Sequence, residues 1–449
     1  MTPLLTDLYE LTMAAGYFEA GLADRTATFE LSLRHLPRNR NFVVAAGLPQ
    51  AVDFLLNSRF DSKEIAYVRS LPQFARAAPA FFEKLAAFRF TGDVWAVPEG
   101  TPLFAGEPVM TVRAPLWQAQ LAETFLLSTI SFQTLIATKA ARITEAAGGC
   151  DVVEFGTRRA HSPEAGVLAG RAAYIGGCIG TSNTLTGFRY GVPVFGTAAH
   201  SWVLAFGEEL EAHRELQKLL GLSTVYLIDT YDTLEGARKA ASLGEPLWGV
   251  RLDSGDLGAL SREVRRILDD AGLGGAKIMA SGDLNEHKIR SLLAVDAPID
   301  VFGVGTELAT SIDAPALGAI YKLVELEAEG ATRYTAKLSA EKATLPGAKQ
   351  IFRWEDHDVI ARADERLDGR PLLSRVVAGG ELTAPLPDAK AARAYAAAAL
   401  AALPERYRCL EHPEPYRVEC SRCLNELFET VCKDLEGVGN RPVRATIRG

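Results

Sequence analysis

Several polar segments in the middle of the chain carry residue types that could do chemistry. The segment Gly249-Val-Arg-Leu-Asp-Ser-Gly-Asp256 places Arg251 and Asp253 on one side of a predicted strand, because side chains alternate along a strand. A guanidinium can bind a carboxylate or phosphate, and a carboxylate can accept hydrogen bonds from sugar hydroxyls or bind Mg²⁺. The same pair could form a plain structural ion pair, so this motif alone leaves both interpretations open.

Two neighbouring segments could hold a phosphate group. Val301-Phe-Gly-Val-Gly-Thr-Glu-Leu308 predicts a strand, a glycine-rich turn and a helix, where free backbone N–H groups and the helix dipole favour an anion. It lacks the third glycine of a dinucleotide-binding fingerprint, which argues against an NAD site. Ser281-Gly282-Asp283 ends the preceding predicted strand, and late barrel strands often supply phosphate-binding loops. A tight turn that requires glycine for its conformation is the alternative.

Other candidate residues follow predicted strands earlier in the chain. Arg158 comes just after the apolar run 152–155, in which Phe155 could pack in a core or present its ring to an aromatic substrate. His200 and Asp229 also follow apolar runs, and a shared position at one rim would suit a catalytic histidine. A lone histidine is more often structural, so that interpretation stays open.

The C-terminal region contains residue types that can bind zinc. Cys409, His412, Cys420 and Cys423 have a tolerable spacing for such a site. Cys420, Cys423 and Leu427 would also share one face of a helix, as small buried thiols do. Zinc is therefore the less favoured of the two interpretations.

The elements that must position these residues are predicted to alternate. Short apolar runs recur after residue 150, at 152–155, 192–195, 224–228, 247–252, 277–280, 300–304 and 320–326. Helical patterns separate most of them, which predicts a parallel sheet covered on both faces. Polar residues follow nearly every run, which favours a barrel, where strand ends meet at one mouth, over an open doubly wound sheet. We expect an α+β domain at 1–135, an α/β barrel at 136–325, and a strand-rich and helical C-terminal segment at 326–449.

Composition limits the classes of function. The chain has 449 residues, of which 48% are hydrophobic and 23% charged, with a formal net charge of −8. This balance argues against a protein whose main partner is nucleic acid or an anionic membrane. We expect no secretory signal, and no apolar run approaches the roughly 20 residues that a membrane-spanning helix needs. Six cysteines are too sparse for a disulfide scaffold. We expect a cytoplasmic protein.

Taken together and in this order, the motifs resemble those of the nicotinate phosphoribosyltransferase family, type II phosphoribosyltransferases of NAD salvage. The matching stretches are Thr6-Asp-Leu-Tyr-Glu-Leu-Thr-Met13, Glu154-Phe-Gly-Thr-Arg-Arg-Ala-His-Ser162, Gly180-Thr-Ser-Asn183, Gly196-Thr-Ala-Ala-His-Ser201, Leu227-Ile-Asp-Thr-Tyr231, Gly249 to Asp256, Ala280-Ser-Gly-Asp-Leu284 and Phe302-Gly-Val-Gly-Thr306. The resemblance implies a type II phosphoribosyltransferase α/β barrel with an N-terminal α+β domain and a small C-terminal segment.

The resemblance also implies a reaction. Nicotinate and phosphoribosyl pyrophosphate (PRPP) would give nicotinate mononucleotide and pyrophosphate, with Mg²⁺ as cofactor. ATP would be hydrolysed through transient phosphorylation of His200, which Asp229 would orient. The active sites would be shared in a homodimer, so that Asp7 and Tyr9 of one subunit reach the barrel of the other.

Individual roles follow from the same resemblance. Phe155 and Tyr9 would enclose the pyridine ring, while Arg158, Arg251 and Asp253 would surround nicotinate and ribose. Further residues would bind the phosphoribosyl group: Ser281, Gly282, Asp283, Gly303, Gly305 and Thr306. Weaker candidates for polyphosphate binding are the cations Arg40, Lys322, Lys337, Lys342 and Lys349.

Ser182 bears on which pyridine is used. Related nicotinamide-using enzymes carry Asp at this position of the Gly-Thr-x stretch. An ionised Asp about 4 Å from a bound carboxylate would cost on the order of 4 kcal/mol at an effective dielectric constant near 20. Ser182 therefore favours nicotinate over nicotinamide. The tail cysteines depart from the family pattern, although some members carry a C-terminal zinc knuckle.

Overall fold

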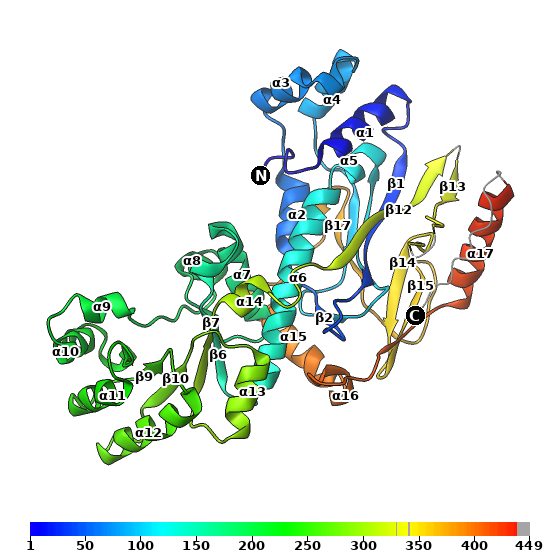
Figure 1. Cartoon of the computed structure of the whole chain (residues 1–449). Helices are drawn as coiled ribbons and strands as arrows, with labels where there is room; N and C mark the ends of the chain where they lie inside the picture. Colours follow the sequence, from blue (N-terminus) through cyan, green and yellow to red (C-terminus); the bar gives the residue numbers. More distant parts are fainter. Residues whose placement is uncertain (329, 340–341, 438–449) are drawn as a thin grey trace. The chain divides into compact units, whose positions relative to one another are not determined.

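The computed structural model describes residues 1–328, 330–339 and 342–437 and divides into two compact units (Figure 1). Unit 1 comprises residues 1–134, 316–387 and 398 onward, and unit 2 comprises residues 135–315 and 388–397. Helices α6 (Glu123–Ala146) and α15 (Ala389–Ala402) each contribute residues to both units. The strands after residue 316 thus belong with the N-terminal region and not to a separate consecutive segment.

Unit 1 is built mainly on an antiparallel sheet whose strand order is β13-β12-β1-β5-β3-β17-β18. Smaller sheets have the orders β16-β14-β15-β19 and β2-β4. The strands are β1 (Thr26–His35), β2 (Val43–Val44), β3 (Asp93–Ala96), β4 (Pro102–Leu103), β5 (Pro108–Pro115), β12 (Gly318–Ala328), β13 (Ala331–Tyr334), β14 (Lys349–Arg353), β15 (His357–Arg362), β16 (Arg370–Pro371), β17 (Ser374–Ala378), β18 (Glu381–Leu382) and β19 (Arg417–Cys420).

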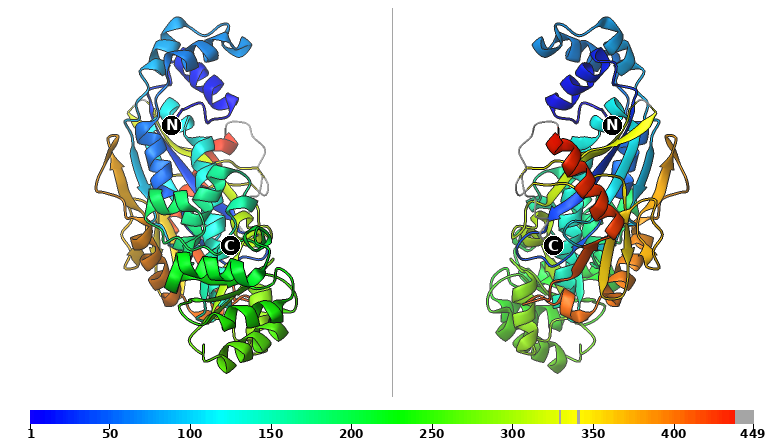
Figure 2. Two further views of the ribbon diagram at one scale, coloured as in Figure 1. Left: turned by 90° about the vertical axis from the view of Figure 1, so that its left-hand side faces the viewer. Right: turned by 90° about the vertical axis from the view of Figure 1, so that its right-hand side faces the viewer.

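Helices pack around these sheets, and α17 contacts β15 (Figure 2). The helices of unit 1 are α1 (Leu8–Glu19), α2 (Leu48–Asn57), α3 (Ser62–Ser70), η1 (Pro72–Phe74), α4 (Pro79–Ala86), α5 (Leu116–Gln120), α16 (Glu405–Arg408) and α17 (Arg422–Gly437). Local sequence explains their ends. Asp61 and Glu64 form a reciprocal capping box at the start of α3. Gly47 precedes α2 at φ +104°, where a Cβ would lie 3.0 Å from the Thr129 carbonyl oxygen.

The run 320–326, expected among the barrel strands, lies instead in β12 of unit 1. Ala27 of β1 pairs with Leu326 of β12 in an antiparallel register. Apolar composition predicts a strand but not its partner, because pairing is decided by the rest of the sheet.

Unit 2 contains a parallel sheet in the order β7-β6-β11-β10-β9-β8. Its strands are β6 (Asp151–Glu154), β7 (Gly180–Thr181), β8 (Val225–Leu227), β9 (Gly249–Leu252), β10 (Lys277–Ala280) and β11 (Val301–Val304). A single parallel bridge joins Thr181 to Val194, where the sequence predicts a longer strand. Residues 135–315 are all described, and among them no β-ladder joins Val194 to β8. The ring of strand hydrogen bonds is therefore not closed between Val194 and β8.

Helices follow the parallel strands as the sequence predicts. They are η2 (Thr157–Arg159), α7 (Pro163–Ile175), α8 (Thr184–Tyr190), α9 (His200–Leu204), α10 (Glu209–Leu220), η3 (Gly221–Ser223), α11 (Thr233–Ser242), α12 (Leu257–Asp270), α13 (Glu286–Ala294) and α14 (Thr306–Thr310). Val153, Met279 and Val301, from three neighbouring strands, pack in one buried cluster. The carboxyl ends of the strands therefore share one edge, as parallel strands require.

One helical stretch, Leu116–Ala146, is long and apolar enough to cross a membrane by length and composition alone. No apolar run of that length is expected from the sequence. In the structure 61% of its most apolar window is buried inside the protein, which is how a core helix meets the same criterion.

Candidate active site

Arg251 joins several loops at the carboxyl edge of the parallel sheet in unit 2. Its Nη2 donates to Asp253 Oδ1 at 2.6 Å, its Nε to Ser281 Oγ at 2.7 Å, and its Nη1 to Thr197 Oγ1 at 2.9 Å. The guanidinium carbon lies 5.7 Å from the centroid of the Phe155 ring. The structure therefore brings Phe155, Arg251, Asp253 and Ser281 together at one point of this edge.

Asp253 is ionised within this cluster. Burial opposes ionisation, but hydrogen bonds from Ser281 and Arg251 and the charge of Arg251 outweigh it, so the pKa of Asp253 is lowered. Its side chain is 26% exposed. A negative charge that is held in place and reachable from solvent can act on a cationic or hydroxyl-bearing ligand.

His200 is the first residue of α9, and its side chain is 42% exposed. Its Nδ1 lies 3.1 Å from Thr230 Oγ1, and its Nε2 lies 3.8 Å from Asp253 Oδ2. Thr230 and not Asp229 therefore contacts the imidazole, which corrects the expected orienting role of Asp229. Thr230 follows Asp229 directly in the chain, so the residue was part of the quoted motif. The motif did not show which of the two side chains points toward His200.

Asp229 faces a different partner. Its Oδ2 accepts hydrogen bonds from the Asp253 backbone N–H at 3.1 Å and from Ser254 Oγ at 2.6 Å. Its Oδ1 is buried and has no hydrogen-bond partner. A carboxylate oxygen left in this state is an acceptor available to a ligand or a hard cation.

The two predicted phosphate turns pack tightly around this cluster. Gly282 has φ +95°, and a Cβ there would lie 2.1 Å from the Asp253 carbonyl oxygen, so only glycine fits. A Cβ on Gly303 would lie 2.5 Å from the Phe155 ring. Gly305 has a negative φ of −104° and directly precedes Thr306, the first residue of α14. The glycines at 282 and 303 thus allow close approach, while phosphate binding by Asp283, Gly305 and Thr306 stays a prediction.

Two other predicted ligands of unit 2 are not hydrogen-bonded to the Arg251 cluster. Arg158 lies in η2 and is exposed. The Ser182 N–H donates to the Glu154 carbonyl oxygen at 2.9 Å, just past the end of β7. Residues that the sequence analysis did not single out, Thr197, Thr230 and Ser254, supply hydroxyl groups to the cluster.

The predicted residues near the N-terminus lie in unit 1. Asp7 precedes α1 at the N-cap position, where its side chain makes no capping hydrogen bond and instead accepts one from Thr124 Oγ1 at 3.0 Å. Tyr9 is 45% exposed, and partial burial together with nearby acidic groups raises the pKa of its hydroxyl to about 12. Its phenol is therefore uncharged at neutral pH and available for contact.

The basic candidates of unit 1 differ from one another. Lys322 lies 3.5 Å from Glu123, and its side chain is 40% exposed, while Lys337 and Lys342 are exposed. Lys349 is 2% exposed, lies 3.2 Å from the buried Glu30 and donates to two backbone carbonyls. The prediction that Lys349 binds polyphosphate is therefore wrong. Arg40 is only 5% exposed, so its predicted role is not supported.

The C-terminal cysteines do not gather around a metal. Among residues 1–328, 330–339 and 342–437, no three His, Cys, Asp or Glu side chains are grouped closely enough to hold an ion. Cys409 Sγ instead contacts the carbonyl oxygens of Arg406 and Glu411. The structure gives no support to a zinc site at Cys409, His412, Cys420 and Cys423.

Family models match most of the chain. Residues 4–131 match the N-terminal domain of nicotinate phosphoribosyltransferase, residues 136–314 the C-terminal domain of quinolinate phosphoribosyl transferase, and residues 348–428 the nicotinate phosphoribosyltransferase C-terminal domain. The nicotinate phosphoribosyltransferase pncB2 of Mycobacterium tuberculosis is 44% identical over 91% of this chain and 89% of its own. The Bacillus subtilis nicotinate phosphoribosyltransferase is 42% identical over 82% and 78% of the two chains.

Solved structures agree with these matches. The human nicotinic acid phosphoribosyltransferase has a TM-score of 0.81 and 31% identity, and it covers 95% of this chain and 100% of its own. The nicotinate-nucleotide pyrophosphorylase of Pyrococcus furiosus has a TM-score of 0.73 and 27% identity over 89% of this chain and 95% of its own. The predicted fold class, a type II phosphoribosyltransferase α/β barrel with an N-terminal α+β domain and a C-terminal segment, is confirmed. The chain belongs to the nicotinate phosphoribosyltransferase family.

Proposed function

We propose that this protein transfers a 5-phosphoribosyl group from PRPP to the ring nitrogen of nicotinate, in NAD salvage. The observation that carries the proposal is the 44% identity, over 91% of the chain, to a protein named for this reaction. The cluster of Arg251, Asp253 and Ser281 supplies a matching site at the carboxyl edge of the barrel.

The chemistry needs positioning and charge more than a protein nucleophile. The pyridine nitrogen attacks the anomeric carbon of PRPP, the bond from that carbon to the pyrophosphate oxygen breaks, and pyrophosphate leaves with the bonding electrons. Positive charge grows on the ribose as this happens, and the ionised carboxylate of Asp253 would stabilise it. Arg251 would attract the carboxylate of nicotinate or a phosphate oxygen.

The family implies Mg²⁺, and the donor set fits it. Asp229 Oδ1 is a buried oxygen without a partner, and Asp253 lies next to it in the hydrogen-bonded cluster. Mg²⁺ usually takes only one or two carboxylates and completes its shell with substrate phosphates and water. Asp229 and Asp253 would hold the ion, whose chemistry would be to neutralise the departing pyrophosphate.

The proposal includes ATP coupling through His200. In the tautomer that carries its proton on Nδ1, this group donates to Thr230 Oγ1, and Nε2 keeps a lone pair. Nε2 would attack the γ-phosphorus of ATP, and the bond to the ADP oxygen would break. Phosphate on His200 after incubation with ATP, found by mass spectrometry, tests this step; unmodified His200 would contradict it.

A homodimer with shared sites is the remaining part of the proposal. Several apolar or aromatic side chains at the start of unit 1 are exposed: Leu5 at 50%, Leu8 at 41%, Tyr9 at 45% and Met13 at 37%. Such a surface suits a second copy of the chain. Tyr9→Ala is expected to raise the KM for nicotinate, and an unchanged KM would remove Tyr9 from the site.

The decisive test is an assay with defined substrates. Purified protein is supplied with PRPP, Mg²⁺, ATP and an equimolar mixture of nicotinate, nicotinamide and quinolinate, and the mononucleotides are separated by chromatography. Nicotinate mononucleotide should dominate. Folded protein that makes no mononucleotide would reject the proposal, and preference for quinolinate would reassign the substrate.

Ser182 offers a sharper test of pyridine choice. Ser182→Asp would place a carboxylate near the pyridine substituent, so the kcat/KM for nicotinate should fall at least tenfold relative to that for nicotinamide. Ser182→Ala, which adds no charge, serves as the control. Equal effects of the two variants would show that charge at this position does not decide the substrate.

A further inference from the structure

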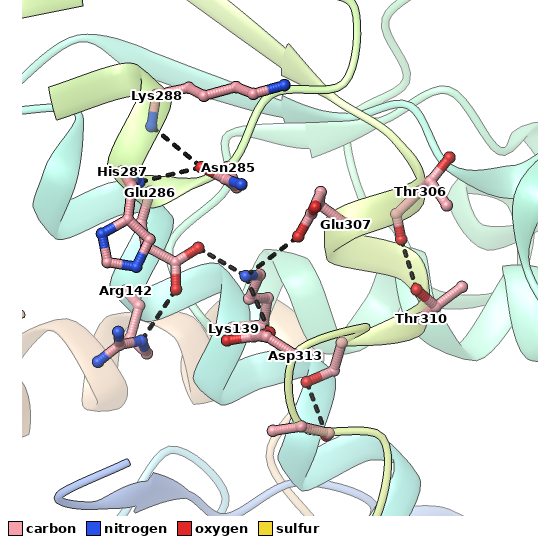
Figure 3. A network of polar contacts seen from close by, with 12 residues as sticks. Lys139, Arg142, Asn285, Glu286, His287, Lys288, Thr306, Glu307, Thr310 and Asp313 are labelled. Carbon is pink, nitrogen blue, oxygen red and sulfur yellow. Dashed lines mark hydrogen bonds and ion pairs between the residues drawn. The ribbon is translucent and has the colours of Figure 1, made fainter. Parts of the chain in front are cut away.

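A buried ion cluster around Lys139 joins segments that follow the two predicted phosphate turns (Figure 3). Lys139 belongs to α6, and its side chain is 2% exposed. Its Nζ lies 2.6 Å from Glu286 Oε2, 2.9 Å from Asp313 Oδ1 and 3.5 Å from Glu307 Oε2. The ammonium group thus donates a hydrogen bond to Glu286 and forms ion pairs with acids from two further segments.

Two of the three acids follow the predicted phosphate turns within a few residues along the chain. Glu286 is the first residue of α13, which follows the turn at residues 281–283. Glu307 is the second residue of α14, which follows Gly305. One ammonium group therefore fixes the far ends of both turns to the same point on α6.

The cluster is charged and resists rearrangement. Glu286 is completely buried, and its second oxygen accepts from Arg142 Nε at 3.1 Å. Burial opposes ionisation of Glu286, but Lys139 and Arg142 outweigh it and lower its pKa. Movement of Glu286 away from α6 would leave buried charges without their partners, which is strongly unfavourable, while movement of Glu307 would break the longer contact at 3.5 Å.

We propose that Lys139 is a positioning residue for the phosphoribosyl substrate, holding the turns after β10 and β11 at the separation that a bound 5-phosphate requires. The proposal rests on the function proposed above. Lys139 acts through Glu286 and Glu307, because its own ammonium group is buried and paired with three acids. Its charge also offsets carboxylates that would otherwise repel a phosphate dianion.

The main test compares Lys139→Met with Lys239→Met. Lys239 is a matched control in the same unit, because its Nζ lies 2.9 Å from Glu209, another acid that is only 1% exposed. Lys239 belongs to α11, which follows β8 and neither of the two turns. Lys139→Met should raise the KM for PRPP at least tenfold while the KM for nicotinate changes less than twofold. Lys239→Met should change neither value. An unchanged KM for PRPP in Lys139→Met, or equal changes in both variants, would overturn the proposal.

A second variant decides the question if Lys139→Met does not fold. Glu307 is 24% exposed, so Glu307→Gln should leave the unit folded while it removes one arm of the cluster. Positioning predicts a rise of about threefold in the KM for PRPP, although a negative charge has been removed. A lower or unchanged KM contradicts positioning, because loss of repulsion alone would strengthen binding.

Failure of this inference and failure of the proposed function look different. No product from the wild-type protein rejects both. Product from the wild-type protein together with an unchanged KM for PRPP in Lys139→Met and Glu307→Gln rejects only the role of Lys139.

Discussion

Two clusters of arginine and carboxylate groups in this molecule differ in their exposure. In unit 2, Arg251 and Asp253 have side chains that are 12% and 26% exposed. In unit 1, Arg353 donates to Asp358, whose side chain is 0% exposed, beside Glu107, which is also 0% exposed. The residue types are the same, yet one cluster is open to a ligand and the other is closed.

The charges of the closed cluster are balanced within the protein. Asp358 accepts hydrogen bonds from Arg353 and from Tyr416 at 3.1 Å. Burial and the charge of Asp358 raise the pKa of Glu107 well above its ordinary value, which favours the neutral form of Glu107. An oxygen without a hydrogen-bond partner occurs in both clusters, at Asp229 Oδ1 in the open one and at Glu107 Oε1 in the closed one. Exposure of the carboxylate side chains, and not the residue types, therefore distinguishes the candidate site from the structural cluster.

The largest effect is expected in the closed cluster. Arg353→Met leaves Asp358 buried without its cation, so the free energy of unfolding of unit 1 should fall by about 3–5 kcal/mol. Urea denaturation measures this loss, and Arg417→Met, which removes an exposed pair with Glu419, is the control with a loss below about 1 kcal/mol. Similar losses in both variants would remove the distinction between closed and open clusters.

Protonation provides the next test, at a second closed position in α10. Burial and the nearby charge of Lys239 lower the pKa of His213 from 6.5 to about 4. His213 therefore binds a proton below pH 6.5 in the unfolded chain but only below about pH 4 in the folded protein. Because the unfolded state binds more protons between these values, the free energy of unfolding falls as the pH falls from 6.5 to about 4. The loss should reach at most about 3.4 kcal/mol. His213→Gln should flatten this part of the pH profile, and a profile identical to wild type would exclude His213 as its cause.

The open cluster should respond in activity. Asp253→Asn keeps the shape of the side chain but removes the charge, so kcat/KM should fall about a hundredfold, or about 2.7 kcal/mol. Asp256→Asn is the control, because Asp256 caps α12 by accepting from the Ala259 N–H and Asn caps helices equally well. Equal kcat/KM values for Asp253→Asn and Asp256→Asn would show that Asp253 does not belong to the active site.

The smallest predicted effect concerns the hydroxyl that contacts His200. A neutral hydrogen bond contributes about 1 kcal/mol, so Thr230→Val should slow phosphorylation of His200 by ATP about fivefold to tenfold. Thr230→Ser retains the hydroxyl and should keep the wild-type rate. Equal rates for Val and Ser would show that the contact at 3.1 Å does not orient the imidazole.

The sequence predicted the parallel sheet because apolar runs and helical patterns alternate, and this signal is local. It also placed Arg251, Asp253 and Ser281 at strand ends, which the structure brings within hydrogen-bond distance of one another. The side-chain directions of Asp229 and Thr230 were not predictable, since they depend on loops that only the folded sheet brings together.

Burial was the other property that the sequence did not reveal. Lys342 and Lys349 lie only a few residues apart in the sequence, yet Lys349 is buried beside Glu30 and Lys342 is exposed. Their difference arises from β14, whose pairing with β15 fixes which residues turn inward. Likewise, no local pattern showed that β12 returns to pair with β1.

The pairing of β1 with β12 has a consequence for synthesis on the ribosome. Ala27 cannot meet Leu326 until nearly all of unit 2 has been translated. Unit 2, apart from residues 388–397, can therefore begin to fold while β1 still has an unpaired edge. Such an edge is a template for aggregation, so we expect the nascent chain to depend on chaperones during this interval.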